Sequence, residues 1–466
     1  MSAAAQSLQT NTRYPEIIKL AWPVAVSILI PQLSMLANTL FLGYYHPQNS
    51  NQGTQDLLAA SGIAGIYYLT LTMIGQGFSS GLLMLLSRKA GENNPAGIGQ
   101  YLSQAYWIAV GLSLTLMTIT ALFAPTLLGF GIHESSILQA AISFIDVRFW
   151  GLPFIFVVQI HHAFFLSTAQ SRNIMAVAVV QAICNIIFDY LFIFGKAGLP
   201  ELGLNGTAYA SVLAEILACG VSVLFLRKAL FLDGVAIKLS LQRDWKNIQY
   251  IFLKSLPLMI QFLLSIGAWL VFFILVEHIG KAESAVSQIL RSVFGIVGVA
   301  TWALGSTCNS MVSNLIGQGN QQQVIHLVYK ILRLSFIFSF ILGLPLIIFP
   351  EYFLNLMTSD AEIALAGIVS LRIVVMATWM LSLSTIYFNA VVGTGNTRFN
   401  MYIEIAAIAL YLGYTFLVVE IFKLSLPWAW GSEFVYWFSL FLMSATYLHS
   451  KKWMLRPINI ETKPSV

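Results

Sequence analysis

Charged residues are scarce in this sequence, since Asp, Glu, Lys and Arg make up only 9% of its 466 residues. A soluble domain carries about 25% charged residues. Three stretches, 20–55, 57–87 and 93–132, contain no charged residue, and each can hold a spanning helix of about 20 residues. Because these stretches are continuously apolar rather than alternating, they predict an all-α membrane protein and exclude a transmembrane β-barrel.

Several motifs are also absent, which excludes classes of function. No GxxxxGK[ST] loop and no HExxH motif occurs, so neither ATP hydrolysis nor a zinc enzyme is expected. The adjacent His161 and His162 diverge by about 100° on a helix and make no two-ligand metal site. The net charge of +5 resides mainly in short loops, so we expect no nucleic-acid partner. We predict a protein that is not an enzyme and has no cofactor or metal.

Hydropathy predicts twelve spanning helices in two sets of six. The first set covers 17–43, 58–86, 100–123, 137–167, 174–195 and 206–226, and the second covers 250–276, 284–312, 328–349, 361–391, 401–421 and 429–449. We expect an N-lobe at 1–227, a cytoplasmic linker at 228–249, a C-lobe at 250–450 and a cytoplasmic tail at 451–466.

An internal repeat relates the two halves. The segment from Ser87 to Asn94 follows the second span, and the segment from Ser313 to Asn320 follows the eighth, at an offset of 226 residues. The same offset pairs Arg172 with Arg398. Two halves with the same topology are related by an axis along the membrane normal, as in transporters built from parallel repeats. The fold class is therefore two pseudo-symmetric six-helix lobes.

The distribution of Lys and Arg predicts the orientation. The termini and the even-numbered loops hold 18 of the 24 basic residues. Cytoplasmic loops carry the excess of Lys and Arg. We therefore expect a multi-pass protein of the cell (inner) membrane with both termini in the cytoplasm.

One carboxylate lies within an apolar run, at Asp189. It is the only ionisable carboxyl between Arg172 and Lys196, and Asn185 lies four residues earlier, on the same face of a helix. A carboxylate at membrane depth is costly and normally faces a bundle interior, an ion or a proton path. The pattern favours a coupling-ion site over a structural Asp that pairs with a neighbouring helix.

Other charged residues within the predicted spans are weaker candidates. Glu215 is a lone mid-span carboxylate and a possible second ionisable site, together with Arg291, which follows Gln288 in span eight. Arg148, near the start of span four, is expected to form a structural ion pair or to reach the outer interface. Glu404 lies close to the cytoplasmic end of its span and is expected at the interface.

A substrate cleft requires side chains that bind organic compounds. Aromatic rings can stack on organic cations, although most aromatics in a membrane bundle serve packing or the interfacial belt. The candidates for the cleft are Gln32, Tyr67, Phe154, Trp302 and Tyr387.

Five stretches together resemble the multidrug and toxic compound extrusion (MATE) family. They are Leu20 to Gly43, the repeated Ser87–Asn94 and Ser313–Asn320 segments, Asn185 to Gly195, Gly203 to Ala210, and Val392 to Arg398. The stretches occur in family order across the whole chain. The resemblance implies a V-shaped pair of lobes and an antiporter that exports amphipathic, often cationic compounds in exchange for H⁺ or Na⁺.

The resemblance also implies an ion site in the N-lobe. Carried over by motif, its residues are Asn185 and Asp189 on the fifth span and Thr207 on the sixth. The family's acid on the first span is replaced here by Asn38. Where other members carry acids on the seventh and tenth spans, this sequence offers only neutral polar residues, so the C-lobe acidic site is expected to be missing.

We expect a monomeric secondary antiporter in the lipid bilayer that transports small amphipathic organic substrates. The alternative within transport is a lipid-linked oligosaccharide flippase of the same superfamily. Such flippases usually carry more cationic residues in the cleft and often fourteen spans, which disfavours this alternative. An intramembrane enzyme is a remote alternative, because no nucleophile–base or metal constellation occurs.

Overall fold

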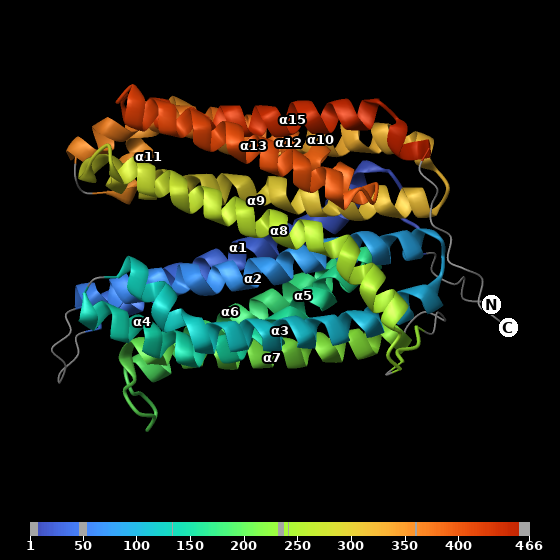
Figure 1. The fold of residues 1–466 in the computed structure, drawn as a ribbon, viewed down its shortest axis with the longest axis horizontal. Helices are drawn as coiled ribbons and strands as arrows, with labels where there is room; N and C mark the ends of the chain where they lie inside the picture. The colour runs from blue at the N-terminus through green and yellow to red at the C-terminus, as the bar shows by residue number, and fades with distance from the viewer. Residues whose placement is uncertain are drawn as a thin grey trace. The chain divides into compact units, whose positions relative to one another are not determined.

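A computed structural model describes residues 8–45, 54–132, 134–231, 237–240, 242–358 and 361–455. Within these ranges the chain is helical and contains no strand (Figure 1). Most of the predicted tail, from 456 onward, lies outside the described residues. The chain divides into two compact units, Met1–Gly267 and Ala268–Val466.

The first unit contains seven long helical segments and the start of an eighth. The elements are α1 (Tyr14–Gly43), α2 (Thr54–Gly91), α3 (Pro95–Gly131), α4 (Ser135–Arg148), α5 (Leu152–Ser167), α6 (Ser171–Ile193), α7 (Gly203–Phe231) and α8 (Trp245–Glu277). A short 3₁₀ turn, η1 (Phe149–Gly151), joins α4 to α5. The elements α4, η1 and α5 together form one membrane crossing, in agreement with the single span predicted at 137–167.

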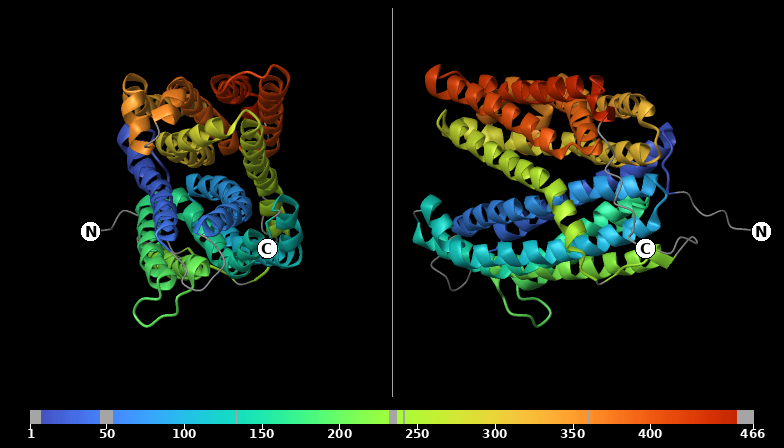
Figure 2. Two further views of the ribbon diagram at one scale, coloured as in Figure 1. Left: turned by 90° about the vertical axis from the view of Figure 1, so that its left-hand side faces the viewer. Right: turned by 45° about the vertical axis from the view of Figure 1, so that its right-hand side comes forward.

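The second unit holds the other helices. They are α9 (Lys281–Gly317), α10 (Val324–Ile348), α11 (Pro350–Met357), α12 (Ala361–Gly393), α13 (Thr397–Phe416), α14 (Leu426–Trp430) and α15 (Ser432–His449). A π-helical turn, η3 (Leu417–Ile421), extends α13. Both α13 and α15 are visible in Figures 1 and 2, and they pack directly on each other.

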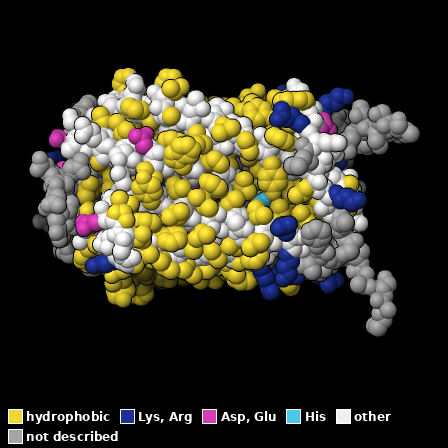
Figure 3. All heavy atoms as spheres, turned by 90° about the horizontal axis from the view of Figure 1, so that it is seen from below, with side chains coloured by type: hydrophobic (Ala, Val, Ile, Leu, Met, Phe, Trp, Pro, Cys, Tyr) yellow, Lys and Arg dark blue, Asp and Glu magenta, His cyan; other side chains and the backbone are white. Residues whose placement is uncertain are grey.

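The all-helical membrane fold predicted from the sequence is confirmed. Among the described residues, eleven helical segments are long and apolar enough to cross a membrane, and each coincides with a predicted span. The predicted twelfth span corresponds to α15, whose 18 residues include Glu433, several hydroxyl side chains and His449. On the face shown in Figure 3, hydrophobic side chains cover the middle, while Lys and Arg gather toward one end.

The boundary between the units differs from the predicted linker at 228–249, because it falls inside α8. The linker is held by the first unit: Gln104 on α3 donates to the carbonyl of Gln242 (2.9 Å) and accepts from the backbone N–H of Asp244 (3.0 Å). The N–H of Ser240 donates to the hydroxyl of Ser103 (2.9 Å). The first turns of α8 also pack on α2, so they belong to the first unit.

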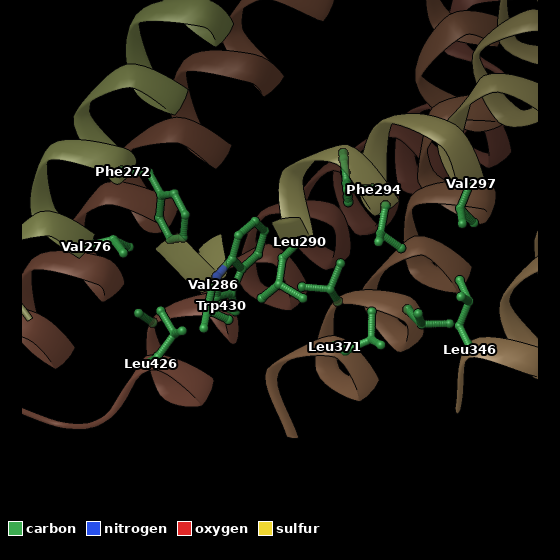
Figure 4. Packing of buried hydrophobic residues seen from close by; sticks show 14 of the residues in the cluster. Phe272, Val276, Val286, Leu290, Phe294, Val297, Leu346, Leu371, Leu426 and Trp430 are labelled. Atoms are coloured by element: carbon green, nitrogen blue, oxygen red, sulfur yellow. The ribbon is translucent and has the colours of Figure 1, made fainter. Parts of the chain in front are cut away.

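A buried hydrophobic cluster organises the second unit (Figure 4). Trp430 is fully buried, packs edge-on to Phe272 with ring centroids 5.1 Å apart, and donates to the hydroxyl of Ser287 (3.1 Å). The cluster also includes Leu290 of α9 and Leu371 of α12. The short α14, which carries Trp430, thereby ties the start of α15 to α8 and α9.

The loop between α6 and α7 fixes how these two helices meet. Gly203 has a positive φ of 53°, and a Cβ there would lie 2.8 Å from the ring of Tyr45. Burial and a hydrogen bond to Glu201 raise the pKa of Tyr45 to about 12. The N–H of Leu202 donates to the carbonyl of Phe192 (2.9 Å). This loop sets the register that brings the adjoining ends of α6 and α7 together.

The contact between α2 and α8 depends on a missing side chain. A Cβ at Gly77 would lie 2.6 Å from the Cα of Met259, whereas a Cβ at Gly65, on the same helix, would meet nothing within 4 Å. We predict that Gly77→Ala destabilises the protein by about 1–3 kcal/mol through overpacking, and that Gly65→Ala does not. Thermal unfolding of the purified protein in detergent measures the difference, and equal melting temperatures would contradict this packing.

Candidate functional site

Asp189 lies at a contact between α6 and α1. Its side chain is fully buried. With the Asn38 amide oriented to satisfy its hydrogen bonds, the amide nitrogen donates to Oδ2 of Asp189 and to the carbonyl of Ser34 (3.2 Å). The orientation of such an amide is assigned from its partners. The structure therefore joins two of the four residues predicted for the ion site.

The other carboxylate oxygen of Asp189 is uncompensated. Within the described residues, Oδ1 is buried and has no hydrogen-bond partner. A buried acceptor without a donor costs roughly 1–3 kcal/mol, and more when it is charged. The charge of Arg148 acts on Asp189 through space, but the guanidinium itself is bound elsewhere. Oδ1 is thus a position where a proton or a bound cation would be stabilising.

The other two predicted residues lie close in the fold but make their own contacts. Asn185 is buried one turn before Asp189, and its amide donates to Ser211 on α7 (3.1 Å). Thr207 is buried on α7, and its hydroxyl donates to the carbonyl of Leu204 in its own helix (2.8 Å). In the described structure, neither Asn185 nor Thr207 forms a hydrogen bond to Asp189.

A second buried constellation lies between α4, α7 and α2. The guanidinium of Arg148 donates twice to Glu215, from Nη1 (2.9 Å) and Nη2 (2.7 Å). Tyr68 donates to the same carboxylate (3.0 Å to Oε2), and its ring lies 3.7 Å from Cζ of Arg148. A paired geometry of this kind is the strongest form of ion pair. It compensates both charges of the pair.

This constellation corrects one interpretation of the sequence and agrees with another. Glu215 is not a lone carboxylate, and Arg148 forms the structural ion pair that was one of its two expected roles. The partners are 67 residues apart in the chain, so no local pattern revealed the pair. Arg291, the other candidate of this class, lies over the ring of Phe273 at 5.8 Å.

One face of α7 carries a stripe of polar side chains. Thr207, Ser211, Glu215 and Ser222 are spaced by four, four and seven residues, which places them on one helix face. Ser222 contacts Nδ1 of His161 on α5 at 2.7 Å. The partners along the stripe come from α6, α4 and α5 in turn. The four-residue spacing of these polar side chains was the signal in the sequence that could have shown that Glu215 faces other helices.

Metal binding finds no support in the described part of the chain. No group of three or more His, Cys, Asp or Glu side chains there could hold a metal ion. Nε2 of His161 lies in hydrogen-bond contact with Tyr106, and Nδ1 contacts Ser222. His161 is therefore a hydrogen-bonded core residue.

The residues predicted for a substrate cleft belong to different units, and each is described within its own. In the first, Gln32 is exposed on α1, Phe154 is half-buried on α5, and Tyr67 donates to Thr120 (3.2 Å). In the second, Tyr387 is buried against Phe441, with ring centroids 5.3 Å apart. Trp302 packs edge-on to Phe294 at 6.2 Å.

Comparison with known proteins decides the family. A family model described as MatE matches residues 23–191 and 257–417, which is most of the chain. The chain belongs to the MatE family. It is thus a membrane transporter and not an enzyme, as its sequence indicated.

Similar MatE proteins include the probable multidrug resistance protein NorM of Thermotoga maritima. It is 24% identical over 419 residues, which cover 89% of this chain and 88% of that protein. The FAD transporter of Shewanella oneidensis is 23% identical over 350 residues, covering 74% of this chain and 75% of that protein.

Two solved structures share the fold. A MATE crystal structure in complex with MaL6 matches with a TM-score of 0.84 at 16% identity, covering 97% of this chain and 99% of the other. A MOP superfamily transporter from Pyrococcus furiosus, whose binding pocket is described as having reverse polarity, also has a TM-score of 0.84, at 17% identity, covering 97% and 98%.

The Arg148–Glu215 pair depends on Gly151, because a Cβ there would overlap Oε2 of Glu215. We predict that Gly151→Ala separates the pair and destabilises the protein by about 3–5 kcal/mol, the cost of an uncompensated buried charge. Gly220→Ala is the matched control, since a Cβ on that α7 residue meets nothing within 4 Å. Thermal unfolding in detergent compares the two variants. Wild-type stability in Gly151→Ala would argue against the pair.

Proposed function

We propose that this MatE transporter is a secondary antiporter that exports small amphipathic, often cationic organic compounds across the cell membrane in exchange for Na⁺ or H⁺. Relatives named as multidrug resistance proteins support the export of such compounds. The proposed ion coupling rests on the buried carboxylate of Asp189. One of its oxygens accepts a hydrogen bond from Asn38, and the other has no hydrogen-bond partner among the described residues.

The surroundings of Asp189 suit a monovalent cation or a proton. A single carboxylate neutralises one positive charge, and the amide oxygens of Asn38 and Asn185 and the hydroxyl of Thr207 are oxygen ligands of the kind that hard cations prefer. Protonation removes the same buried charge without any ligand. Because Asn38 replaces the acid found in relatives with two carboxylates, this site handles at most one proton per cycle.

An anionic substrate, as in the flippase alternative, requires cationic side chains that are free to bind it. Arg148 is committed to Glu215 in a two-point ion pair. Of the arginines that lie well inside the other described spans, Arg291 is half-buried, and Arg333 and Arg372 are exposed. This supports export of cationic or neutral compounds over transport of an anion.

Replacing Asp189 tests the coupling site. We predict that Asp189→Asn lowers gradient-driven efflux of a cationic dye by at least about tenfold, because the amide cannot bind a proton or neutralise a cation. Asp146→Asn, which alters an exposed carboxylate on α4, is the control and is expected to pump normally. Efflux is measured in proteoliposomes, with Na⁺ and pH gradients imposed separately to identify the ion.

Two further outcomes bear on the same proposal. Asn38→Asp restores a second carboxylate next to Asp189 and is expected to keep activity while changing its dependence on pH. Wild-type efflux in Asp189→Asn under the same gradients would contradict the proposed site. If the wild-type protein moves an oligosaccharide-linked lipid and no dye, the flippase alternative replaces this function.

Both termini are proposed to be cytoplasmic, from the distribution of Lys and Arg. We predict that Lys238→Cys, in the linker, is labelled from the cytoplasmic side by a membrane-impermeant maleimide, and that Lys196→Cys, in the α6–α7 loop, is labelled from outside. The background lacks the native Cys184, Cys219 and Cys308. Labelling of both positions from the same side would contradict the topology.

A further inference from the structure

The second unit contains a buried carboxylate that the coupling site does not use. Glu433, on the first turn of α15, is 3% exposed. The indole N–H of Trp437 donates to its Oε2 (2.8 Å), and the hydroxyl of Tyr411 on α13 donates to its Oε1 (3.3 Å).

No described Lys, Arg or His forms an ion pair with Glu433. The elements packed on α15 include α12, α13, α14 and the short η4 (Lys452–Leu455). Side chains of α9 and α10 also contact α15, Phe294 at Trp437 and Tyr329 at His449, and the latter is at the opposite end of α15 from Glu433. Of these, α13 presents the titratable groups Tyr411 and Glu404, and Glu404 is engaged by Tyr436 of α15 (2.6 Å). α14 contains no titratable residue, and no charged group of α12 contacts Glu433 among the described residues. Its two partners are therefore both neutral.

The pair formed by Arg148 and Glu215 is an example in this protein of a buried carboxylate whose negative charge is balanced by a cation. Glu215 has a two-point contact with a guanidinium as well as a tyrosine hydroxyl. Glu433 has a tyrosine hydroxyl and an indole, but no cation. An ionised carboxylate in that position is costly, since it is buried and neutral donors do not cancel its charge.

We propose that Glu433 is a proton-binding site of the second unit, protonated and deprotonated during transport. The neighbours select a proton over a metal ion. The indole of Trp437 has only a donor to offer, and a hard cation would need several oxygen ligands that the immediate contacts do not supply. Protonation of the carboxyl removes the buried charge without requiring any further ligand.

The surrounding aromatics hold the carboxyl in place. The rings of Tyr411 and Tyr436 lie 5.4 Å apart, and Tyr436 packs edge-on to Trp437 at 4.6 Å. Phe272 stacks on Tyr411 at 5.8 Å and contacts the fully buried Trp430. A change in the charge of Glu433 therefore acts on groups that are packed into the core of this unit.

Infrared spectroscopy of the full chain in proteoliposomes tests proton binding directly. In a pH titration, the wild-type protein should show the carbonyl stretch of a protonated carboxylic acid, and Glu433→Gln should lose one such contribution. Glu420→Gln, at a half-buried carboxylate that contacts His278 in the same unit, should keep the contribution that Glu433→Gln loses. An unaltered carboxylic-acid band in Glu433→Gln would overturn the assignment.

Tyr411→Phe provides a second test that keeps the packed ring. It removes the hydroxyl that donates to Oε1 and should shift the midpoint of the same band while leaving the band present. If Glu433→Gln does not fold, the shift of this pH midpoint in Tyr411→Phe decides whether Glu433 binds a proton. An unchanged midpoint in a folded Tyr411→Phe protein would overturn the proposal. The indole fluorescence of Trp437 offers a parallel readout, because its N–H is bound to the titrating group.

The role in transport rests on the proposed antiport function and is tested separately. We expect Glu433→Gln to slow efflux driven by a pH gradient by about tenfold, the size of one typical coupling between sites, and Glu420→Gln to have no effect. Wild-type rates in Glu433→Gln would overturn the coupling role. If the wild-type protein moves no dye under either gradient, the antiport function fails, while the infrared titration still decides whether Glu433 binds a proton.

Discussion

The cost of holding charge inside a membrane-spanning bundle governs the structure of this transporter. An ionisable side chain there must be paired, hydrogen-bonded, or able to lose its charge. Glu215 meets the first condition through Arg148. Asp189 and Glu433 do not, because each is buried without an ion-pair partner among the described residues. This difference separates the carboxylate whose charge is compensated by an ion pair from the two that we propose exchange ions.

Close helix packing makes this separation possible. The absence of a side chain at Gly151 allows the carboxylate of Glu215 to reach Arg148, and Gly203 allows the start of α7 to pack against Tyr45. With α7 in this register, its polar face meets a different neighbouring helix at each turn. The same face therefore carries both the compensated pair and, one helix turn away, the contact between Ser211 and Asn185.

Properties that depend on local sequence were predictable. The apolar runs predicted eleven crossings that the structure contains, and the four-residue spacing of Asn185 and Asp189 identified a buried polar face of α6. Properties that depend on contacts between residues far apart in the sequence were not predictable. The pairing of Arg148 with Glu215 requires two helices to meet. The burial of Glu433 likewise involves a residue distant in the chain, because its partner Tyr411 lies 22 residues earlier, on α13.

The residues that surround Asp189 differ chemically from those that surround Glu433, and this difference favours different ions at the two carboxylates. Asn38 presents an amide to Asp189, and an amide that turns over exchanges its donor for an acceptor. With nitrogen toward Asp189 it stabilises the free carboxylate; with oxygen turned inward it adds a ligand to a bound cation. The indole of Trp437 cannot exchange a donor for an acceptor in this way, because its N–H is only a hydrogen-bond donor. We therefore propose that Asp189 accepts either a cation or a proton and that Glu433 accepts only a proton, with the ion selectivity of each unit set by the neighbour that faces its carboxylate.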